Sequence, residues 1–302
     1  MNYVEYGKEN SDVIILLHGG GLSWWNYKEV AERLQTDYHV VLPILDGHAG
    51  CDKQFTTIEN NALDIIEFVN SKLGGSVLMM GGLSLGGQIL LEILSQRKDI
   101  CKYAIVESVL VIPSKFTYSM IKPAFGSCYG LIKYKWFSKL QFKSLRIKSN
   151  LFDEYYKDTC AIRKSDMIAF LQENSVYSLK DGIGECEATV QIYVGEKEKQ
   201  SMKKSAKIIH EKLQDSFIQV LPNMYHGEFS ILSLTVVRRK NRCIPCDYWV
   251  TAISVVVLKY SNLIFPFTFL LYCSHFTLCY KLIVCPKTAG FMKIIRNLFS
   301  FI

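Results

Sequence analysis

The chain has 302 residues, 49% of them hydrophobic, and a formal net charge of +7. Residues 1–228 contain 26 basic and 27 acidic residues, whereas residues 229–302 contain nine basic residues and one acidic residue. The positive charge therefore belongs to the C-terminal part and does not indicate that the main body binds nucleic acid. We expect no nucleic-acid partner.

The first clear strand is predicted over residues 13–17, which form an unbroken apolar run. Such a run is typical of a strand that is buried on both faces of a parallel sheet. No basic-plus-apolar leader of the kind that directs secretion precedes it, so the expected localisation is cytoplasmic.

The loop His18-Gly19-Gly20-Gly21 follows this strand. Its glycines leave backbone N–H groups uncovered, and acyl transfer needs such donors for the oxyanion of its transition state. The N–H of Gly20 is one expected donor, and His18 is expected to brace the loop. A flexible turn is an alternative. A phosphate-binding loop fits poorly, because no Lys-Ser/Thr pair and no G-x-G-x-x-G spacing are present.

A strand over residues 38–43 and an amphipathic helix come next. The helix is expected to begin near a capping box at residues 56–59. The residues expected on its buried face are Ile58, Leu63, Ile65, Ile66 and Val69. This alternation of strands and helices indicates a mostly parallel, doubly wound α/β sheet.

Ser84 lies in Gly82-Leu83-Ser84-Leu85-Gly86, between an apolar run at residues 76–80 and a helical pattern at residues 88–94. A strand, a sharp turn and a helix in this order are typical of a nucleophile elbow, although a plain Gly-Ser-Gly turn is the alternative. The glycines avoid a collision between Cβ atoms and neighbouring backbone. The strained turn holds the serine hydroxyl where a substrate carbonyl reaches it. The N–H of Leu85 is the second expected oxyanion donor.

A strand over residues 103–112 precedes about 75 residues that the sheet does not need, and we expect residues 113–186 to form a helical cap over the site. Residues 113–148 contain eight basic residues, no acidic residue and interleaved aromatic residues. This pattern fits solvated lysines around an aromatic cap core, or a cap that favours an acyl substrate with an anionic group. Trp24 and Trp25 could line an acyl pocket or belong to the core.

The second half of the predicted core has a strand over residues 189–194, a helix over residues 202–213 and a strand over residues 217–221. Glu198 follows the first of these strands and His226 follows the last. A serine hydroxyl needs a histidine base, which a carboxylate orients. Serine, acid and histidine occur in that chain order here, each just beyond a strand end.

These motifs resemble those of capped, esterase- and lipase-like serine hydrolases with the α/β-hydrolase fold. The resemblance covers about residues 2–230 and rests on His18-Gly19-Gly20, Asp46-Gly47-His48-Ala49-Gly50, the Ser84 elbow, residues 195–198 and the His226 loop. It implies Ser84 as the nucleophile, Glu198 as the acid and His226 as the base. The family more often has Asp as the acid, and Glu196 and Glu107 remain alternatives.

The remainder of the chain departs from this pattern. The expected organisation is a first core part at residues 1–112, a helical cap at 113–186, a second core part at 187–230 and an atypical tail at 231–302. The tail is basic and apolar, and it contains five of the ten cysteines. Cys243-Ile244-Pro245-Cys246 does not predict a metal site, because no second C-x-x-C follows it.

Two interpretations of the tail stay open. Residues 261–280 contain no Asp, Glu, Lys or Arg and are long enough to span a bilayer. The abrupt change in charge, glycine and cysteine content near residue 230 instead favours a segment foreign to the fold, produced by a frameshift or read-through. Membrane contact is expected only through residues 248–285.

The sequence thus predicts a serine hydrolase without metal or cofactor, which cleaves a carboxylic ester or related acyl substrate through a Ser-His-Glu triad and an acyl-enzyme. Its expected partner is a small acyl molecule. An acyltransferase on the same machinery and a non-catalytic binding or sensor protein on this fold are the alternatives. Neither the substrate nor the oligomeric state follows from the sequence.

Overall fold

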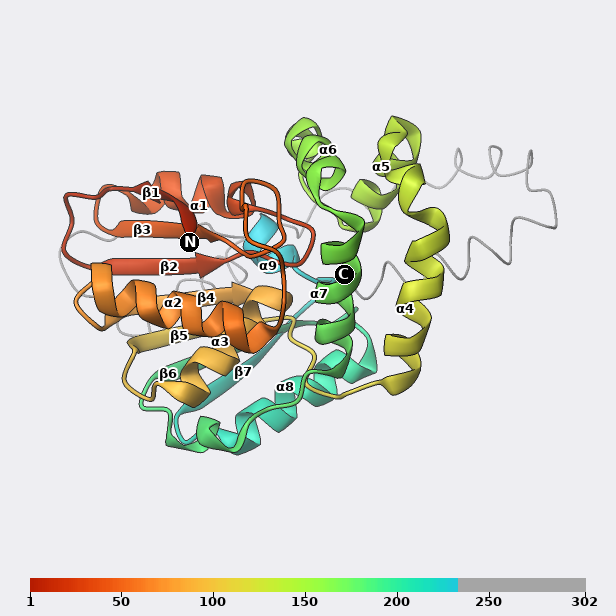
Figure 1. The fold of residues 1–302 in the computed structure, drawn as a ribbon. Coiled ribbons are helices and arrows are strands. Elements are labelled where there is room, and N and C mark those ends of the chain that lie inside the picture. Colours follow the sequence, from red (N-terminus) through yellow and green to blue (C-terminus); the bar gives the residue numbers. More distant parts are fainter. Residues whose placement is uncertain (233–302) are drawn as a thin grey trace, which may run out of the picture. The chain divides into compact units, whose positions relative to one another are not determined.

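A seven-stranded sheet with the strand order β1-β3-β2-β4-β5-β6-β7 forms the centre of the computed structural model, which describes residues 1–232 (Figure 1). The strands are β1 (Asn2–Tyr6), β2 (Val13–Leu17), β3 (His39–Ile44), β4 (Val77–Leu83), β5 (Cys101–Glu107), β6 (Thr189–Gly195) and β7 (Ser216–Leu221). β1 pairs with β3 in the antiparallel direction, and the other pairings among these strands are parallel. The predicted mostly parallel α/β sheet is confirmed.

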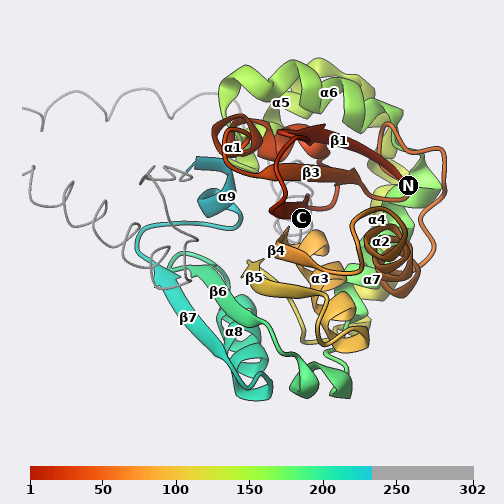
Figure 2. The same cartoon turned by 90° about the vertical axis from the view of Figure 1, so that its left-hand side faces the viewer.

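Helices cover both faces of this sheet. Figure 2 shows α2, α3 and α8 on one side of the strands and α1 and α9 on the other. Their bounds are α1 (Lys28–Leu34), α2 (Ile58–Lys72), α3 (Leu85–Gln96), α8 (Gln200–Lys212) and α9 (Glu228–Leu232). β3 is buried along its whole length, and β2 and β6 are buried beyond their first residue. Burial on both faces explains why these strands appear in the sequence as continuous apolar runs.

The start and the buried face of α2 differ slightly from the prediction. Thr57 is the N-cap, and its side chain accepts a hydrogen bond from the N–H of Asn60, so the helix begins one residue later than a box at residues 56–59 implies. Leu63 is 48% exposed, whereas Ala62 is fully buried. The helical period places Ala62, and not Leu63, in the stripe that faces the sheet.

The carboxyl ends of the parallel strands meet at one edge of the sheet. The register pairs Leu17 with Gly82, Leu83 with Glu107, Glu107 with Tyr193 and Gly195 with Leu221. β5 ends at Glu107, and not at residue 112 as predicted, because Ser108 has a φ of +54° that an extended strand does not allow. The segments that follow these strands therefore start close together.

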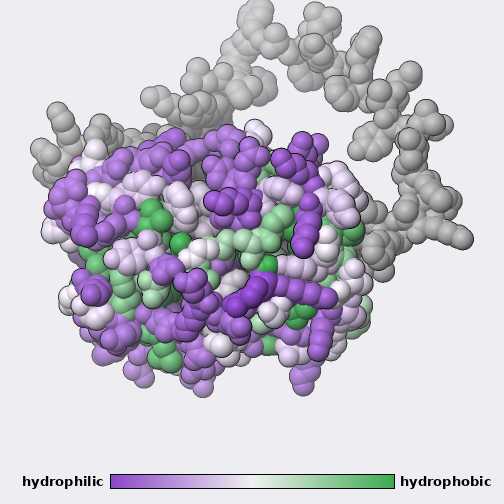
Figure 3. All heavy atoms as spheres, turned by 45° about the horizontal axis from the view of Figure 1, so that its top comes forward, coloured by the Kyte–Doolittle hydropathy of each residue, from purple (hydrophilic) through white to green (hydrophobic). Residues whose placement is uncertain are grey.

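Residues 113–186, here called the helical segment, connect β5 with β6. They contain α4 (Lys115–Cys128), α5 (Lys135–Ser144), α6 (Phe152–Ala161), α7 (Lys164–Val176) and three short 3₁₀ helices, η2 (Tyr129–Lys133), η3 (Ser149–Leu151) and η4 (Asp181–Glu185). Phe125, Phe137 and Phe142 are buried, whereas Phe116 and Trp136 are 79% and 63% exposed. The aromatic residues of this segment thus divide between its core and its surface. On the face shown in Figure 3, hydrophobic residues are scattered among hydrophilic ones.

The predicted tail lies outside the described residues from position 233 onward. This holds for the C-x-x-C at residues 243–246, the uncharged stretch at 261–280 and the membrane-contact segment at 248–285. Within residues 1–232, no helix combines the length and the apolar character needed to cross a membrane. The same residues contain no cluster of three or more His, Cys, Asp or Glu side chains arranged to hold a metal ion.

Candidate active site

Ser84 occupies a strained turn between β4 and α3. Its φ and ψ are 52° and −111°, which a non-glycine residue rarely adopts. A Cβ at Gly82 would lie 2.5 Å from the carbonyl oxygen of Gly86, and a Cβ at Gly86 would lie 2.3 Å from that of Leu17. The glycines on either side of Ser84 are therefore required by close backbone approach, as the sequence predicts.

Glu198 and His226 lie together at the ends of β6 and β7. Nδ1 of His226 is 3.0 Å from Oε2 of Glu198, whose side chain is 1% exposed. Oε1 of Glu198 accepts hydrogen bonds from the Gly195 N–H, at 2.7 Å, and from the Ser108 hydroxyl, at 2.8 Å. Burial by itself raises the pKa of Glu198, but the hydrogen bond and charge of His226 and the other two donors outweigh it, so this pKa is lowered.

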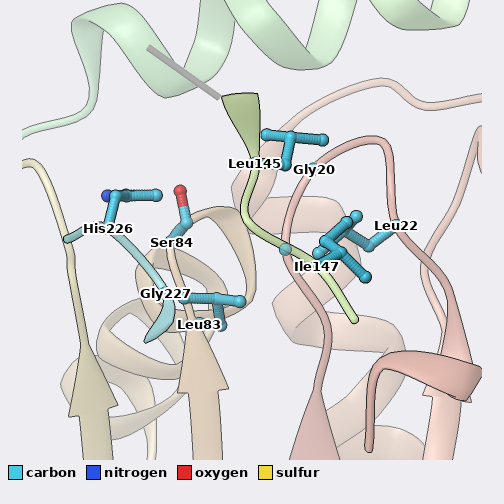
Figure 4. Close-up of a pocket in the computed structure, with 9 residues that line it drawn as sticks. Gly20, Leu22, Leu83, Ser84, Leu145, Ile147, His226 and Gly227 are labelled. Carbon is cyan, nitrogen blue, oxygen red and sulfur yellow. The ribbon is translucent and has the colours of Figure 1, made fainter. Parts of the chain in front are cut away.

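Nε2 of His226 is buried and has no hydrogen-bond partner among residues 1–232. The pocket beside it has a volume of about 300 Å³, including the part open to solvent, and its lining residues are Gly19, Gly20, Leu22, Leu83, Ser84, Leu145, Ile147, His226 and Gly227. Figure 4 shows Ser84 beside His226, with Leu145, Ile147 and Leu22 on the other side of the hydroxyl. The structure thus brings Ser84, Gly20 and His226 into one apolar pocket.

The residues that carry the two expected oxyanion donors, Gly20 and Leu85, are neighbours in the fold. A Cβ built on Gly20 would lie 3.5 Å from the side chain of Leu85, and the Gly20 N–H has no acceptor within the described part of the chain. Leu85 is the first residue of α3, where a backbone N–H has no partner in the helix. Gly21 is not available, because its N–H donates to Nε2 of His48 at 3.0 Å.

Two buried histidines hold this glycine loop in place. Nε2 of His18 accepts from the Leu45 N–H at 3.2 Å, and Nε2 of His48 accepts from Gly21. Burial lowers the pKa of His18 to about 3 and that of His48 to about 4. Both imidazoles are therefore neutral near pH 7 and act as acceptors, which agrees with the bracing role expected for His18.

The two alternative acids point elsewhere. Oε2 of Glu196 accepts from the Asn223 N–H at 2.8 Å. The carboxylate of Glu107 accepts from the N–H groups of Phe229 and Ser230. Within residues 1–232, neither carboxylate hydrogen-bonds to His226, so Glu198 is the acid that geometry favours.

Several residues at the site carry no clear signal in the sequence. Leu145 and Ile147 line the pocket from the helical segment. Trp25, which could have lined an acyl pocket, is buried and its indole N–H donates to Asp158. Phe170 of α7 stacks on His48 with ring centroids 4.7 Å apart. The motif containing His48 could have indicated a role beside the glycine loop. The contributions of Leu145, Ile147 and Phe170 depend on chain segments that only the fold brings together.

Comparison with known families decides the classification. Residues 14–181 match the model of the alpha/beta hydrolase family. The chain belongs to this family. This α/β hydrolase has no match among curated protein sequences.

Solved structures with the same fold share little sequence with this α/β hydrolase. An esterase from Thermogutta terrifontis, in its malate-bound form, is 16% identical to this chain. The alignment covers 85% of this chain and 93% of the esterase chain, with a TM-score of 0.63. A hydrolase from Pseudomonas aeruginosa is 11% identical, with coverages of 86% and 93% and a TM-score of 0.64. MenH from S. aureus is 16% identical, with coverages of 86% and 98% and a TM-score of 0.61. At these identities the likeness concerns the fold alone.

Proposed function

We propose that this hydrolase cleaves carboxylic esters through an acyl-enzyme on Ser84. The observation that carries the proposal is the state of His226. Its Nδ1 is held by buried Glu198, while its Nε2 has no partner among the described residues and lines the same pocket as Ser84. A histidine oriented in this way, beside a serine in an elbow, is equipped to act as a general base.

In the proposed reaction, Ser84 Oγ attacks the ester carbonyl carbon while its proton passes to Nε2 of His226. The negative charge that develops on the carbonyl oxygen is stabilised by the N–H groups of Gly20 and Leu85. The imidazolium, stabilised by Glu198, then gives its proton to the departing alkoxide. A water molecule repeats the sequence on the acyl-enzyme, releasing the carboxylic acid and restoring the Ser84 hydroxyl.

The pocket favours an acyl group that is uncharged and apolar. Leu22, Leu83, Leu145 and Ile147 supply its side-chain walls. Burying an unpaired charge against such walls is costly, whereas each buried methylene contributes about 0.8 kcal/mol. The exposed lysines of the helical segment do not line this pocket. We therefore expect the enzyme to prefer neutral esters to substrates with an anionic acyl group.

Reaction with a fluorophosphonate probe tests the nucleophile. Wild-type protein should be labelled once, at Ser84, and Ser84→Ala should not be labelled. His226→Ala should be labelled far more slowly, because the base is gone. Wild-type protein that resists the probe while remaining folded would point to the non-catalytic binding protein.

A series of nitrophenyl esters then tests the substrate class. We expect kcat/KM to rise as the acyl chain is lengthened from acetate by a few methylene groups. It should be lower for esters whose acyl group ends in a carboxylate. A stronger preference for the anionic acyl group would contradict the proposed pocket chemistry. Hydroxylamine trapping detects the acyl-enzyme, and analysis of the products formed with an added alcohol distinguishes release of the free acid from transfer to the alcohol.

A further inference from the structure

Ser108, the residue directly after β5, has a backbone conformation that L residues rarely adopt. Its φ is +54°, and the residue is 2% exposed. Its N–H donates to the carbonyl of Tyr193 at 2.9 Å. Non-glycine residues in this region persist where the surroundings hold them, and they cluster at functional sites. The strain at Ser108 therefore calls for an explanation from its contacts.

The hydroxyl of Ser108 bridges the acid and the histidine loop. It donates to Oε1 of Glu198 at 2.8 Å and accepts from the N–H of Gly227 at 3.2 Å. Gly227 directly follows His226 in the chain. A serine hydroxyl has one proton and two lone pairs, so it can serve both partners at once.

This bridge determines how Glu198 faces His226. One carboxylate oxygen, Oε1, is occupied by the Ser108 hydroxyl and the Gly195 N–H, so the other, Oε2, is left for Nδ1 of His226. Because two donors bind Oε1, they oppose rotation of the Glu198 carboxylate. The contact with the Gly227 N–H restrains the backbone next to His226, the partner of Glu198.

The residue before Ser108 holds further parts of the site. The backbone carbonyl of Glu107 accepts from the Ser84 N–H at 2.9 Å. Its carboxylate accepts from the N–H of Phe229 at 3.1 Å and from that of Ser230. The end of β5 thus contacts the turn at Ser84, the Glu198 carboxylate and the backbone that follows His226.

We propose that Ser108 is a positioning residue, whose hydroxyl holds the Glu198 carboxylate and the Gly227 backbone so that Glu198 stays against Nδ1 of His226. Ser108 does not line the substrate pocket. The inference rests on the proposed roles of Ser84, His226 and Glu198. It adds to them the group that joins the acid to the histidine loop.

Two substitutions separate the hydroxyl from the strained backbone. Ser108→Ala removes the hydroxyl and keeps the strain, whereas Ser108→Gly removes the hydroxyl and relieves the strain. We expect kcat to fall roughly tenfold to a hundredfold in both variants, which corresponds to leaving a buried polar partner unpaired. KM should stay within about twofold. Ser108→Cys, with its weaker donor, should retain more activity than either.

Ser175→Ala is the matched control. Ser175 is also 2% exposed, and its hydroxyl donates only within α7, to the carbonyl of Gln172 at 2.7 Å. This variant should keep wild-type kcat. A loss of kcat in Ser108→Ala but not in Ser108→Gly would overturn the inference, because strain and not the hydroxyl would be responsible. Values within about twofold of wild type in both Ser108 variants would also overturn it.

The pH dependence of kcat/KM distinguishes a positioning role of Ser108 from a merely structural one, which would leave that dependence unchanged. The Ser108 donor stabilises the negative charge of the Glu198–His226 pair, so its removal makes the pair easier to protonate. The acidic limb of kcat/KM should move to higher pH in both variants. An unshifted acidic limb contradicts the inference, whereas wild-type protein that fails to react with fluorophosphonate contradicts the proposed function.

Discussion

The guanidinium of Arg146 lies over the ring of Tyr225, with Cζ 3.6 Å from the ring centroid. Arg146 also pairs with Glu228, at 3.5 Å between Nη1 and Oε1. Tyr225 directly precedes His226, and the neighbours of Arg146, Leu145 and Ile147, line the substrate pocket. One side chain of the helical segment is thus attached to the histidine loop while the two beside it face the proposed acyl group.

Removing this attachment should loosen the pocket wall. For Arg146→Ala we expect KM for apolar esters to rise roughly twofold to fivefold, the equivalent of one exposed cation–π contact. The value of kcat should change by less than about threefold, because His226 keeps its bond to Glu198. Arg146→Lys should fall between wild type and Arg146→Ala, since lysine keeps the charge but loses the planar stacking. Lys122→Ala, an exposed cation in the same segment, is the control. An unchanged KM would show that the wall does not depend on this contact.

Substitution of the three candidate acids tests which of them orients His226. Glu198→Gln should lower kcat on the order of 10⁴-fold, because the amide no longer stabilises the imidazolium that forms during the reaction. Slow labelling of Ser84 by fluorophosphonate should persist. Glu196→Gln and Glu107→Gln should remain within about tenfold of wild type, as each carboxylate contacts backbone N–H groups away from Nδ1. Glu107→Gln as the most damaging change would refute the assignment of Glu198.

Glu107 should make the stability of the protein depend on pH. Burial raises its pKa from 4.5 to about 7 in the folded protein. Between these two values the folded protein keeps a proton that the unfolded chain has released, so the stabilisation present below pH 4.5 is lost as the pH rises through about 7. The free energy of unfolding of wild type, relative to Glu107→Gln, should therefore fall by up to about 1.4 kcal/mol per pH unit in this window.

Urea unfolding at several pH values between 4.5 and 7 measures this difference. Glu196→Gln serves as the control, since Glu196 is an exposed carboxylate. Parallel pH profiles for wild type and Glu107→Gln would mean that Glu107 is ionised in the folded protein throughout the window.

The basic surface of the helical segment should have little effect on substrate choice. Lys133, Lys135, Lys139 and Lys143 are exposed and do not line the pocket. Reversing these four charges should change kcat/KM by a similar, small factor for neutral and anionic esters. Leu145→Lys, which places a cation in the pocket wall, should instead shift the preference toward anionic acyl groups. An effect of the four reversals on anionic substrates alone, fading as salt rises, would support the cap that selects anionic substrates.

Local patterns in the sequence were sufficient for the elements that depend on neighbouring residues. The apolar runs at β2 and β6 predict buried parallel strands because both of their faces are covered. The elbow at Ser84 was identifiable because its backbone strain requires glycines at fixed short spacing. Where the prediction was wrong, as for Leu63 in α2 or for the end of β5, the error was one of helix phase or of a single backbone angle.

Contacts across the sheet edge depended instead on the tertiary structure. Three glutamates were candidates for the acid, and their order along the chain does not distinguish them, because the choice depends on which carboxylate the register places against His226. The Ser108 hydroxyl reaches a partner 90 positions away, and Leu145 and Ile147 line the same pocket as Ser84 only in the folded chain. Sequence alone therefore determined the scaffold and the strained turn at Ser84, whose geometry is local. Only the fold decided the groups that orient the histidine and shape the pocket, because those contacts join segments that the chain separates.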